Sequence, residues 1–229
     1  MRNYILYSIL EIGLVVIGIL LALYINDWNE EKKDRREEYE LLVGIKNNLV
    51  NDVQVLEGFI ERAQELQGFA DSLLKVMSNP DEYTNEEFFY YFNPLQDNLY
   101  FTTNSGYFDE AISTGKVGFI KNDSIREKLF DYYRVTKRNY NDEETRFHYR
   151  DKFAPDVLFE LITTKEIAGI LGYTANFPSL DVKKLVASKP FNSALLQKVF
   201  SFRPQLSSWR YYLSKAEELL AEIEEELNH

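Results

Sequence analysis

Residues that commonly perform acid–base or metal chemistry are sparse in this sequence. Only two histidines occur among 229 residues, and one of them is the last residue. His148 is therefore the single internal candidate for a general base or a metal ligand. On a helix, Glu144 and Asp151 would share a face with His148 and could supply oxygen ligands. The interpretation we favour is an ion-paired surface histidine beside Arg146 and Arg150.

Motifs of common enzymes and cofactor sites are also absent. The sequence contains no Gly-x-Ser-x-Gly nucleophile motif, no His-Glu-x-x-His zinc motif and no Gly-x-x-x-x-Gly-Lys-Ser/Thr phosphate loop. A di-metal helical site would need two Glu-x-x-His motifs on separate helices, which the sequence does not contain. Because there is no cysteine, thiolate zinc sites, disulfides and thiol nucleophiles are excluded. We expect no catalytic residue, no metal ligand and no cofactor.

Charge and composition narrow the classes of partner. The chain has a net charge of -11 and a pI near 4.8, which disfavours nucleic-acid binding because a phosphate backbone requires clustered Lys and Arg. Aromatic residues make up 15% of the chain, which argues against disorder. We therefore expect an ordered domain and no DNA or RNA partner.

An apolar segment near the N-terminus predicts a membrane anchor. The uncharged residues 12–25 cover only about 21 Å of helix, whereas an extension back to Tyr4 covers about 33 Å, enough for a hydrocarbon core of about 30 Å. No small-x-small cleavage site follows, so residues 1–28 are predicted to be an uncleaved transmembrane helix. Its expected aromatic anchors at the two headgroup levels are Tyr4, Tyr7, Tyr24 and Trp28.

Glu11 lies within this predicted span. A carboxylate there costs up to about 2.5 to 3.5 kcal/mol. It either stays hydrated or protonated near the headgroups, or it makes a hydrogen-bonded contact with another membrane helix. Gly18 and Ala22 have the small-xxx-small spacing that lets two helix backbones approach. Glu11, Gly18 and Ala22 are therefore the candidate membrane-helix contact.

The residues after the anchor predict one long helix. Residues 29–41 are mostly charged and are expected to form a helical stalk. From Leu42 a heptad frame places apolar residues at ten of eleven a and d positions, with Asp52 at the remaining one. The helix should end before Pro80, because proline disfavours helical geometry in its predecessor.

Aromatic residues are concentrated between Tyr83 and Phe101, too densely for one amphipathic face. Packing across the end of a helical bundle is the first interpretation, and a groove for an aromatic ligand or a protein is the second. The candidate binding surface consists of Phe88, Tyr91, Tyr107 and Phe108.

Capping signals predict the remaining helices. Asn104-Ser105 and Gly115 bound a short helix, and Asn122-Asp123-Ser124 begins another. Residues 163–190 are expected to be an irregular loop with a short helix, and a last helix is expected after Pro204. The predicted fold class is all-α, with an N-terminal transmembrane helix that continues into a long stalk helix, followed by an antiparallel helical bundle at residues 42–229.

The span itself carries a resemblance. Residues 11–23, followed by Ile25-Asn26 and Trp28-Asn29-Glu30, resemble an uncharacterised family of single-span membrane proteins abundant in Bacteroidota, a domain of unknown function. A looser similarity runs from Tyr107 to Tyr133. The resemblance implies an inner-membrane anchor with a periplasmic domain, and it implies that Glu11 belongs to the span motif. Counting Lys and Arg, one before the span and four after it, favours a cytoplasmic domain instead, so charge leaves the orientation open.

These observations lead to an expected function without a biochemical activity. The preferred hypothesis is a non-enzymatic, membrane-anchored accessory or scaffold protein that binds another envelope protein or a second copy of itself. The first alternative is an envelope sensor that binds a small ligand and signals through a partner. The remote alternative is a membrane-tethered, carboxylate-based hydrolase, for which His148 is the one residue-level candidate.

Overall fold

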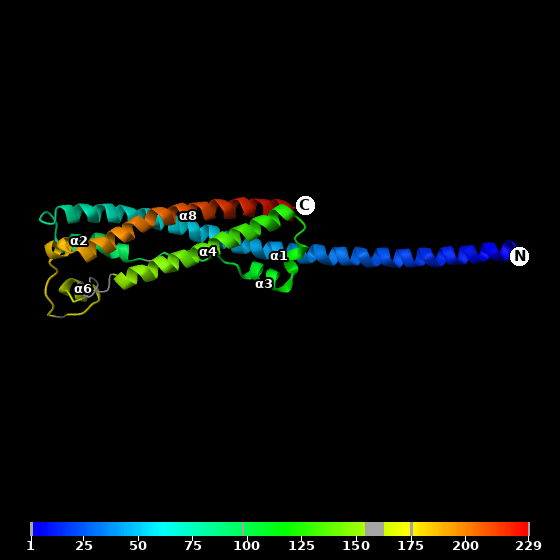
Figure 1. Ribbon diagram of the computed structural model, residues 1–229, viewed down its shortest axis with the longest axis horizontal. Helices are drawn as coiled ribbons and strands as arrows, with labels where there is room; N and C mark the ends of the chain where they lie inside the picture. Colours follow the sequence, from blue (N-terminus) through cyan, green and yellow to red (C-terminus); the bar gives the residue numbers. More distant parts are fainter. Residues whose placement is uncertain (1, 98, 154–162, 175, 229) are drawn as a thin grey trace. The chain divides into compact units, whose positions relative to one another are not determined.

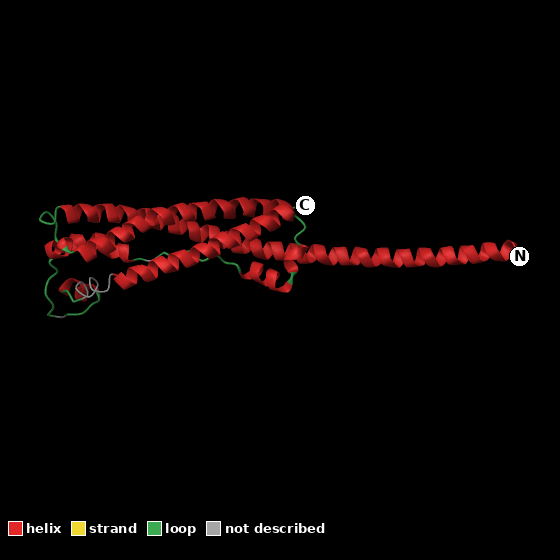
Figure 2. Cartoon of the chain, viewed as in Figure 1, coloured by secondary structure: helices red, strands yellow, loops and turns green. Residues whose placement is uncertain are grey.

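The computed structural model describes the backbone of residues 2–97, 99–153, 163–174 and 176–228, and the side chains of these ranges outside residues 2–12 and 139–153. The regular elements of this part are all helical, and no strand occurs in it (Figures 1 and 2). The predicted all-α class and the long N-terminal helix are confirmed. In chain order the elements are α1 (Arg2–Ser78), α2 (Asn85–Phe92), η1 (Asn93–Gln96), α3 (Gly106–Thr114), η2 (Lys116–Phe119), α4 (Asp123–Phe153), α6 (Lys165–Ile170), α7 (Val182–Ala187) and α8 (Lys189–Leu227).

Local signals place several helix ends where the sequence predicts them. Helix α1 ends at Ser78, two residues before Pro80. Helix α3 ends at Thr114 and is capped by Gly115, whose φ of 76° is the left-handed conformation that glycine adopts without strain. Asn122 caps α4, because its Oδ1 accepts hydrogen bonds from the backbone N–H groups of Ser124 and Ile125 at 3.1 and 3.3 Å. These three boundaries are confirmed.

The expected start of the last helix is wrong. Helix α8 begins at Lys189 and runs through Pro204, so it begins sixteen residues earlier than the sequence predicts. Pro190 lies in its first turn, where a missing N–H costs nothing. Pro204 does remove a helical hydrogen bond, at a cost of about 3 kcal/mol. Phe202 and Leu206, on either side of Pro204, are both buried, and their packing offsets that cost. The preceding segment also contains two short helices, α6 and α7, in place of one.

The chain divides into two compact units, each described by itself. The first unit contains Met1–Asn48, Ser105–Glu127 and Ala221–His229, and the second contains Leu49–Asn104 and Lys128–Leu220.

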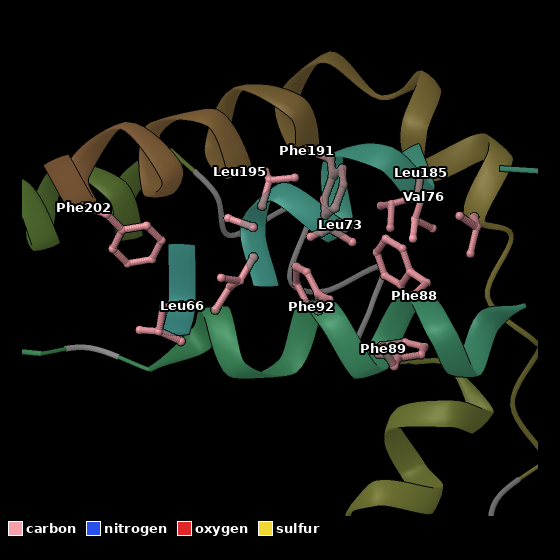
Figure 3. Packing of buried hydrophobic residues seen from close by; sticks show 13 residues of the cluster. Leu66, Leu73, Val76, Phe88, Phe89, Phe92, Leu185, Phe191, Leu195 and Phe202 are labelled. Carbon is pink, nitrogen blue, oxygen red and sulfur yellow. The ribbon is translucent and has the colours of Figure 1, made fainter. Parts of the chain in front are cut away.

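Two apolar clusters form the core of the second unit. One joins α1 to α2, η1, α7 and α8 (Figure 3), and in it the Phe88 ring stacks on Phe92 with centroids 5.4 Å apart. These rings therefore pack in an apolar core, and their position at the end of a helical bundle stays a prediction. The other cluster contains Trp209, which is fully buried and lies 5.5 Å from Phe59 between ring centroids. Its buried members are Leu56, Ala63, Phe101, Leu206, Trp209 and Tyr212.

The first unit has a smaller core, in which α3 lies against α1 at a glycine. The Tyr107 ring covers Gly44, so close that a Cβ at position 44 would overlap three ring atoms. Glycine is required here because it lets the aromatic ring approach the helix backbone. The buried apolar side chains of this unit are Leu41, Leu42, Ile45, Phe108, Ala111, Ile120, Ile125 and Ile223.

Gly44→Ala is expected to lower the free energy of unfolding by about 1 to 3 kcal/mol, because the added methyl group displaces the ring of Tyr107. In a Tyr107→Ala background the same substitution should stabilise the chain by up to about 1 kcal/mol, since alanine is the better helix former. Chemical denaturation of the detergent-solubilised full chain measures both values. Gly58→Ala is the matched control, because nothing lies within 4 Å of its added Cβ. Equal effects of Gly44→Ala in both backgrounds would show that the Tyr107 contact is unimportant.

Candidate functional site

The N-terminal part of α1 exposes a continuous apolar surface. Every residue from Leu14 to Ile25 is uncharged and exposed, Leu14 reaches 76%, and Trp28 is exposed about one turn further along the helix. By length and composition this helix could cross a membrane. Its apolar stretch of 18 residues has a mean hydropathy of 1.2, and none of that stretch is buried. An exposed apolar patch of this size is typical of a surface that contacts lipid or another protein.

The residues predicted at the membrane are placed only in part. Gly18 and Ala22 lie on the exposed run, and nothing lies within 4 Å of a Cβ built at Gly18. Tyr24 and Trp28 are exposed at its C-terminal end, where Lys32 Nζ lies 3.8 Å from the Trp28 ring centroid. The side chains of Glu11, Tyr4 and Tyr7 lie outside the described residues, as does that of His148.

Within the first unit, carboxylates tie the end of the predicted stalk to residues 116–121. Glu38 is buried, and its Oε1 accepts a hydrogen bond of 2.6 Å from the backbone N–H of Lys121. Beside it, Glu37 pairs with Lys116 Nζ at 2.8 Å, and this hydrogen bond and charge lower the pKa of Glu37. The charged segment that follows the apolar surface is therefore not solvated throughout, because its last turns are fixed to residues 116–121.

Asp52, the one polar residue among the a and d positions of the heptad frame, is a buried carboxylate of the second unit. Its side chain is buried and accepts three hydrogen bonds from two other segments. Thr103 Oγ1 donates to Oδ2 at 2.5 Å, the Tyr132 hydroxyl donates to the same oxygen at 2.7 Å, and the backbone N–H of Asn104 donates to Oδ1 at 2.8 Å. Asp52 therefore joins α1 to α4 and to the segment before α3.

Burial and hydrogen bonding act in opposite directions on this carboxyl group. Burial raises the pKa of Asp52, and the bonds from Thr103, Asn104 and Tyr132 oppose the shift. Burial, together with the charge of Asp52, also raises the pKa of Tyr132, so this phenol stays protonated and remains a donor. With both oxygens already bound by the chain's own donors, the geometry makes Asp52 a tie between segments. The described residues hold no cluster of three metal-ligating side chains.

A hollow of about 160 Å³ lies beside Tyr132. Its charged side chains neutralise one another: Glu218 accepts from Lys128 at 2.7 Å and from Lys215 at 3.0 Å, and these two lysines lower the pKa of Glu218 to about 2. Arg134 likewise pairs with Asp131 at 2.7 Å. This hollow leaves little unpaired charge for a ligand.

The four residues predicted as a binding surface fall in different surroundings. Phe88 and Tyr91 belong to the second unit, where Phe88 is fully buried and Tyr91 is half-buried. In the first unit, Phe108 is buried and Tyr107 lies half exposed on Gly44. Phe88 and Phe108 are therefore core residues of the second and the first unit, respectively. Sequence reasoning did not single out Asp52, although a lone carboxylate in an otherwise apolar seam is the signal that could have identified it.

Comparison with known proteins gives a family and no activity. The model of a family of unknown function (DUF6090) matches residues 11–153, which is more than half of the chain. The matched range contains the exposed apolar surface and the contacts that Glu37 and Glu38 make with residues 116–121. It also contains Asp52 and its three hydrogen-bond donors, Thr103, Asn104 and Tyr132. No curated protein and no solved structure matches the chain. The chain therefore belongs to the DUF6090 family, whose function is unknown.

Proposed function

We propose that this protein is a non-enzymatic accessory or scaffold protein, anchored by α1 in the inner membrane, whose periplasmic helical domain binds another envelope protein. The observation that carries this proposal is that the exposed apolar surface from Leu14 to Ile25 and the packed seam from Leu41 onward lie on one unbroken helix. An apolar face with no covering chain is stable in lipid, whereas a packed seam holds a folded domain. The antiparallel bundle of residues 42–229 is part of this proposal.

A scaffold role also fits the distribution of polar groups. The buried carboxylates Glu38 and Asp52 each accept hydrogen bonds from distant segments, so they stabilise the fold. Within the span, Glu11, Gly18 and Ala22 are the proposed contact with a membrane partner or a second copy. A carboxyl group at that depth is stabilised by a hydrogen-bond donor from another helix.

The anchor is tested by charge insertion. Leu20→Arg/Leu21→Arg should move the full chain from the membrane fraction to the soluble or degraded fraction, because each arginine costs about 2.5 to 3.5 kcal/mol at the centre of a span. Asn26→Arg/Asn29→Arg adds the same charge beyond the apolar run and should leave the chain in alkali-washed membranes. Wild-type protein that alkali removes from the membrane would contradict an integral anchor.

Orientation and partnership need separate measurements. A C-terminal alkaline phosphatase fusion should be active and a C-terminal fluorescent fusion dark if the domain is periplasmic, and the reverse pattern would place it in the cytoplasm. Extraction of the full chain in mild detergent should recover a stoichiometric protein partner or a homo-oligomer. Recovery as a lone monodisperse monomer would contradict the scaffold role.

A further inference from the structure

Among its described residues, the second unit also contains a groove lined by two arginines and no carboxylate, unlike the hollow beside Tyr132, whose charged side chains pair with one another. This groove has a volume of about 350 Å³ and lies between α1 and α8. Helix α1 contributes Gln64 and Gln67, and helix α8 contributes the rest of the lining. The lining residues, which we call the Arg203–Arg210 groove, are Gln64, Gln67, Arg203, Leu206, Ser207 and Arg210.

Among the described residues, no carboxylate neutralises the two arginines of this groove. No carboxylate lines the groove, and within the described residues neither Arg203 nor Arg210 makes an ion pair or a side-chain hydrogen bond. Elsewhere in the same unit Arg62 binds both Asp97 and Glu65. Two exposed, unpaired guanidinium groups in one groove of a chain with a net charge of -11 indicate a site for an external anion.

The spacing of the groove residues defines the shape of that anion. Arg203, Ser207 and Arg210 are four and three residues apart, so they share one face of α8, and the two arginines are about 10 Å apart along the axis at about 1.5 Å per residue. Each guanidinium can bind a carboxylate through two parallel hydrogen bonds. In the polyproline II conformation, which repeats every three residues with a rise of about 3.1 Å per residue, two carboxylates three residues apart lie on one face of the peptide. They are then separated by about 9 Å, close to the distance between the two arginines.

The uncharged groups suit the backbone of such a peptide. The amides of Gln64 and Gln67 each offer a donor and an acceptor, and the Ser207 hydroxyl can do either. These groups therefore match peptide N–H and C=O groups between the two carboxylates, while buried Leu206 forms the floor. A long polyanion such as a nucleic acid is disfavoured because the surrounding chain is strongly acidic.

We propose that the Arg203–Arg210 groove binds an extended acidic segment of the protein partner, with two carboxylates three residues apart paired to Arg203 and Arg210. This inference rests on the proposed scaffold role and names the chemistry of the partner that the role requires.

The test uses the detergent-solubilised full chain and a fluorescein-labelled peptide, Gly-Ser-Asp-Ser-Gly-Asp-Ser-Gly, followed by fluorescence anisotropy. The peptide should bind the wild type, and Arg203→Gln/Arg210→Gln should weaken binding at least about 10-fold, because the variant loses two charged hydrogen-bond pairs with the aspartates. Lys165→Gln/Lys184→Gln removes the same charge from exposed positions elsewhere in the unit and should change the affinity less than about 2-fold by long-range charge alone.

Control ligands separate specific binding from general attraction. The peptide with both aspartates replaced by asparagine, and the peptide with its aspartates adjacent, should each bind at least about 10-fold more weakly. The proposal would be overturned if Arg203→Gln/Arg210→Gln and Lys165→Gln/Lys184→Gln weakened peptide binding equally. It would also be overturned if the asparagine peptide bound the wild type as tightly as the aspartate peptide. Competition by free succinate or phosphate at the same concentration as the peptide would show that the groove takes small anions and would also overturn it.

The outcome is distinguishable from that of the scaffold role. If a partner co-purifies with the wild type and with Arg203→Gln/Arg210→Gln alike, and the acidic peptide does not bind, the groove proposal fails and the scaffold role stands. If the peptide binds as expected but the chain is recovered as a lone monomer, the groove chemistry stands and the scaffold role fails.

Discussion

Asp52→Ala is expected to lower the free energy of unfolding of the full chain by about 3 kcal/mol. The substitution leaves the Thr103 hydroxyl, the Tyr132 hydroxyl and the Asn104 N–H without their acceptor, and each buried unsatisfied donor costs about 1 to 3 kcal/mol. It also removes the tie between α1, α4 and the segment before α3. Denaturant titration followed by circular dichroism measures the loss.

Asp52→Asn is the matched variant, because its shape is the same and only the charge and one acceptor oxygen change. Its Oδ1 can still accept from Asn104, but the amide nitrogen cannot accept from both hydroxyls that bind Oδ2. We expect a loss of about 1 to 2 kcal/mol, between those of the wild type and the alanine variant. A loss below about 0.5 kcal/mol for Asp52→Ala, typical of surface substitutions, would contradict the role assigned to this carboxyl group.

The same pair of chains gives a pH dependence whose sign follows from the raised pKa of Asp52. In the unfolded chain this group loses its proton near its ordinary value of 3.8, whereas in the folded chain it keeps the proton to a higher pH. Its contribution is therefore fully present below pH 3.8 and is lost as the pH rises through the folded pKa. The amount by which the wild type exceeds Asp52→Asn in unfolding free energy should therefore fall as the pH rises from 3.8 through the folded pKa of Asp52. A difference that grows with pH would mean that the hydrogen bonds outweigh burial.

Trp209→Ala is expected to lower the free energy of unfolding by about 3 to 5 kcal/mol. The indole is fully buried, packs against Phe59 and stands at the centre of the cluster formed by α1, α8 and residue 101. Removal of the indole leaves a cavity in this cluster, because the surrounding helices relax only partially into the empty space. Thermal and chemical denaturation of the solubilised chain measure the loss.

The second tryptophan provides the control for this prediction. Trp28 is half exposed on the apolar part of α1, so Trp28→Ala should change the unfolding free energy of the domain by less than about 0.5 kcal/mol. In the Trp28→Ala background, Trp209 is the only tryptophan, and its emission should shift to longer wavelength in the same transition that circular dichroism follows. Equal stabilities of the Trp209→Ala and Trp28→Ala chains would contradict the core assignment.

Features that depend on neighbouring residues were predictable from the sequence. The end of α1 before Pro80, the left-handed Gly115 and the Asn122 cap follow from the conformations and hydrogen bonds available to those residues and their immediate neighbours. The heptad frame also predicted the buried side of α1, because the helical period fixes which residues share a face. The start of α8 was missed because the local penalty of Pro204 is offset by packing that local sequence does not reveal.

The sequence by itself thus determined an all-α chain with a long N-terminal helix, an apolar segment near its start and no motif of a known enzyme. Only the tertiary structure decided that Asp52 is bound by Thr103 and Tyr132, which are 51 and 80 residues away along the chain, and that Phe88 and Phe108 are buried. It also brought Gln64 and Gln67 beside two arginines of α8 for which the described part of the chain supplies no carboxylate partner. The physical reason is range: helix period and caps act within a few residues, whereas burial, charge pairing and grooves depend on which distant segments pack together.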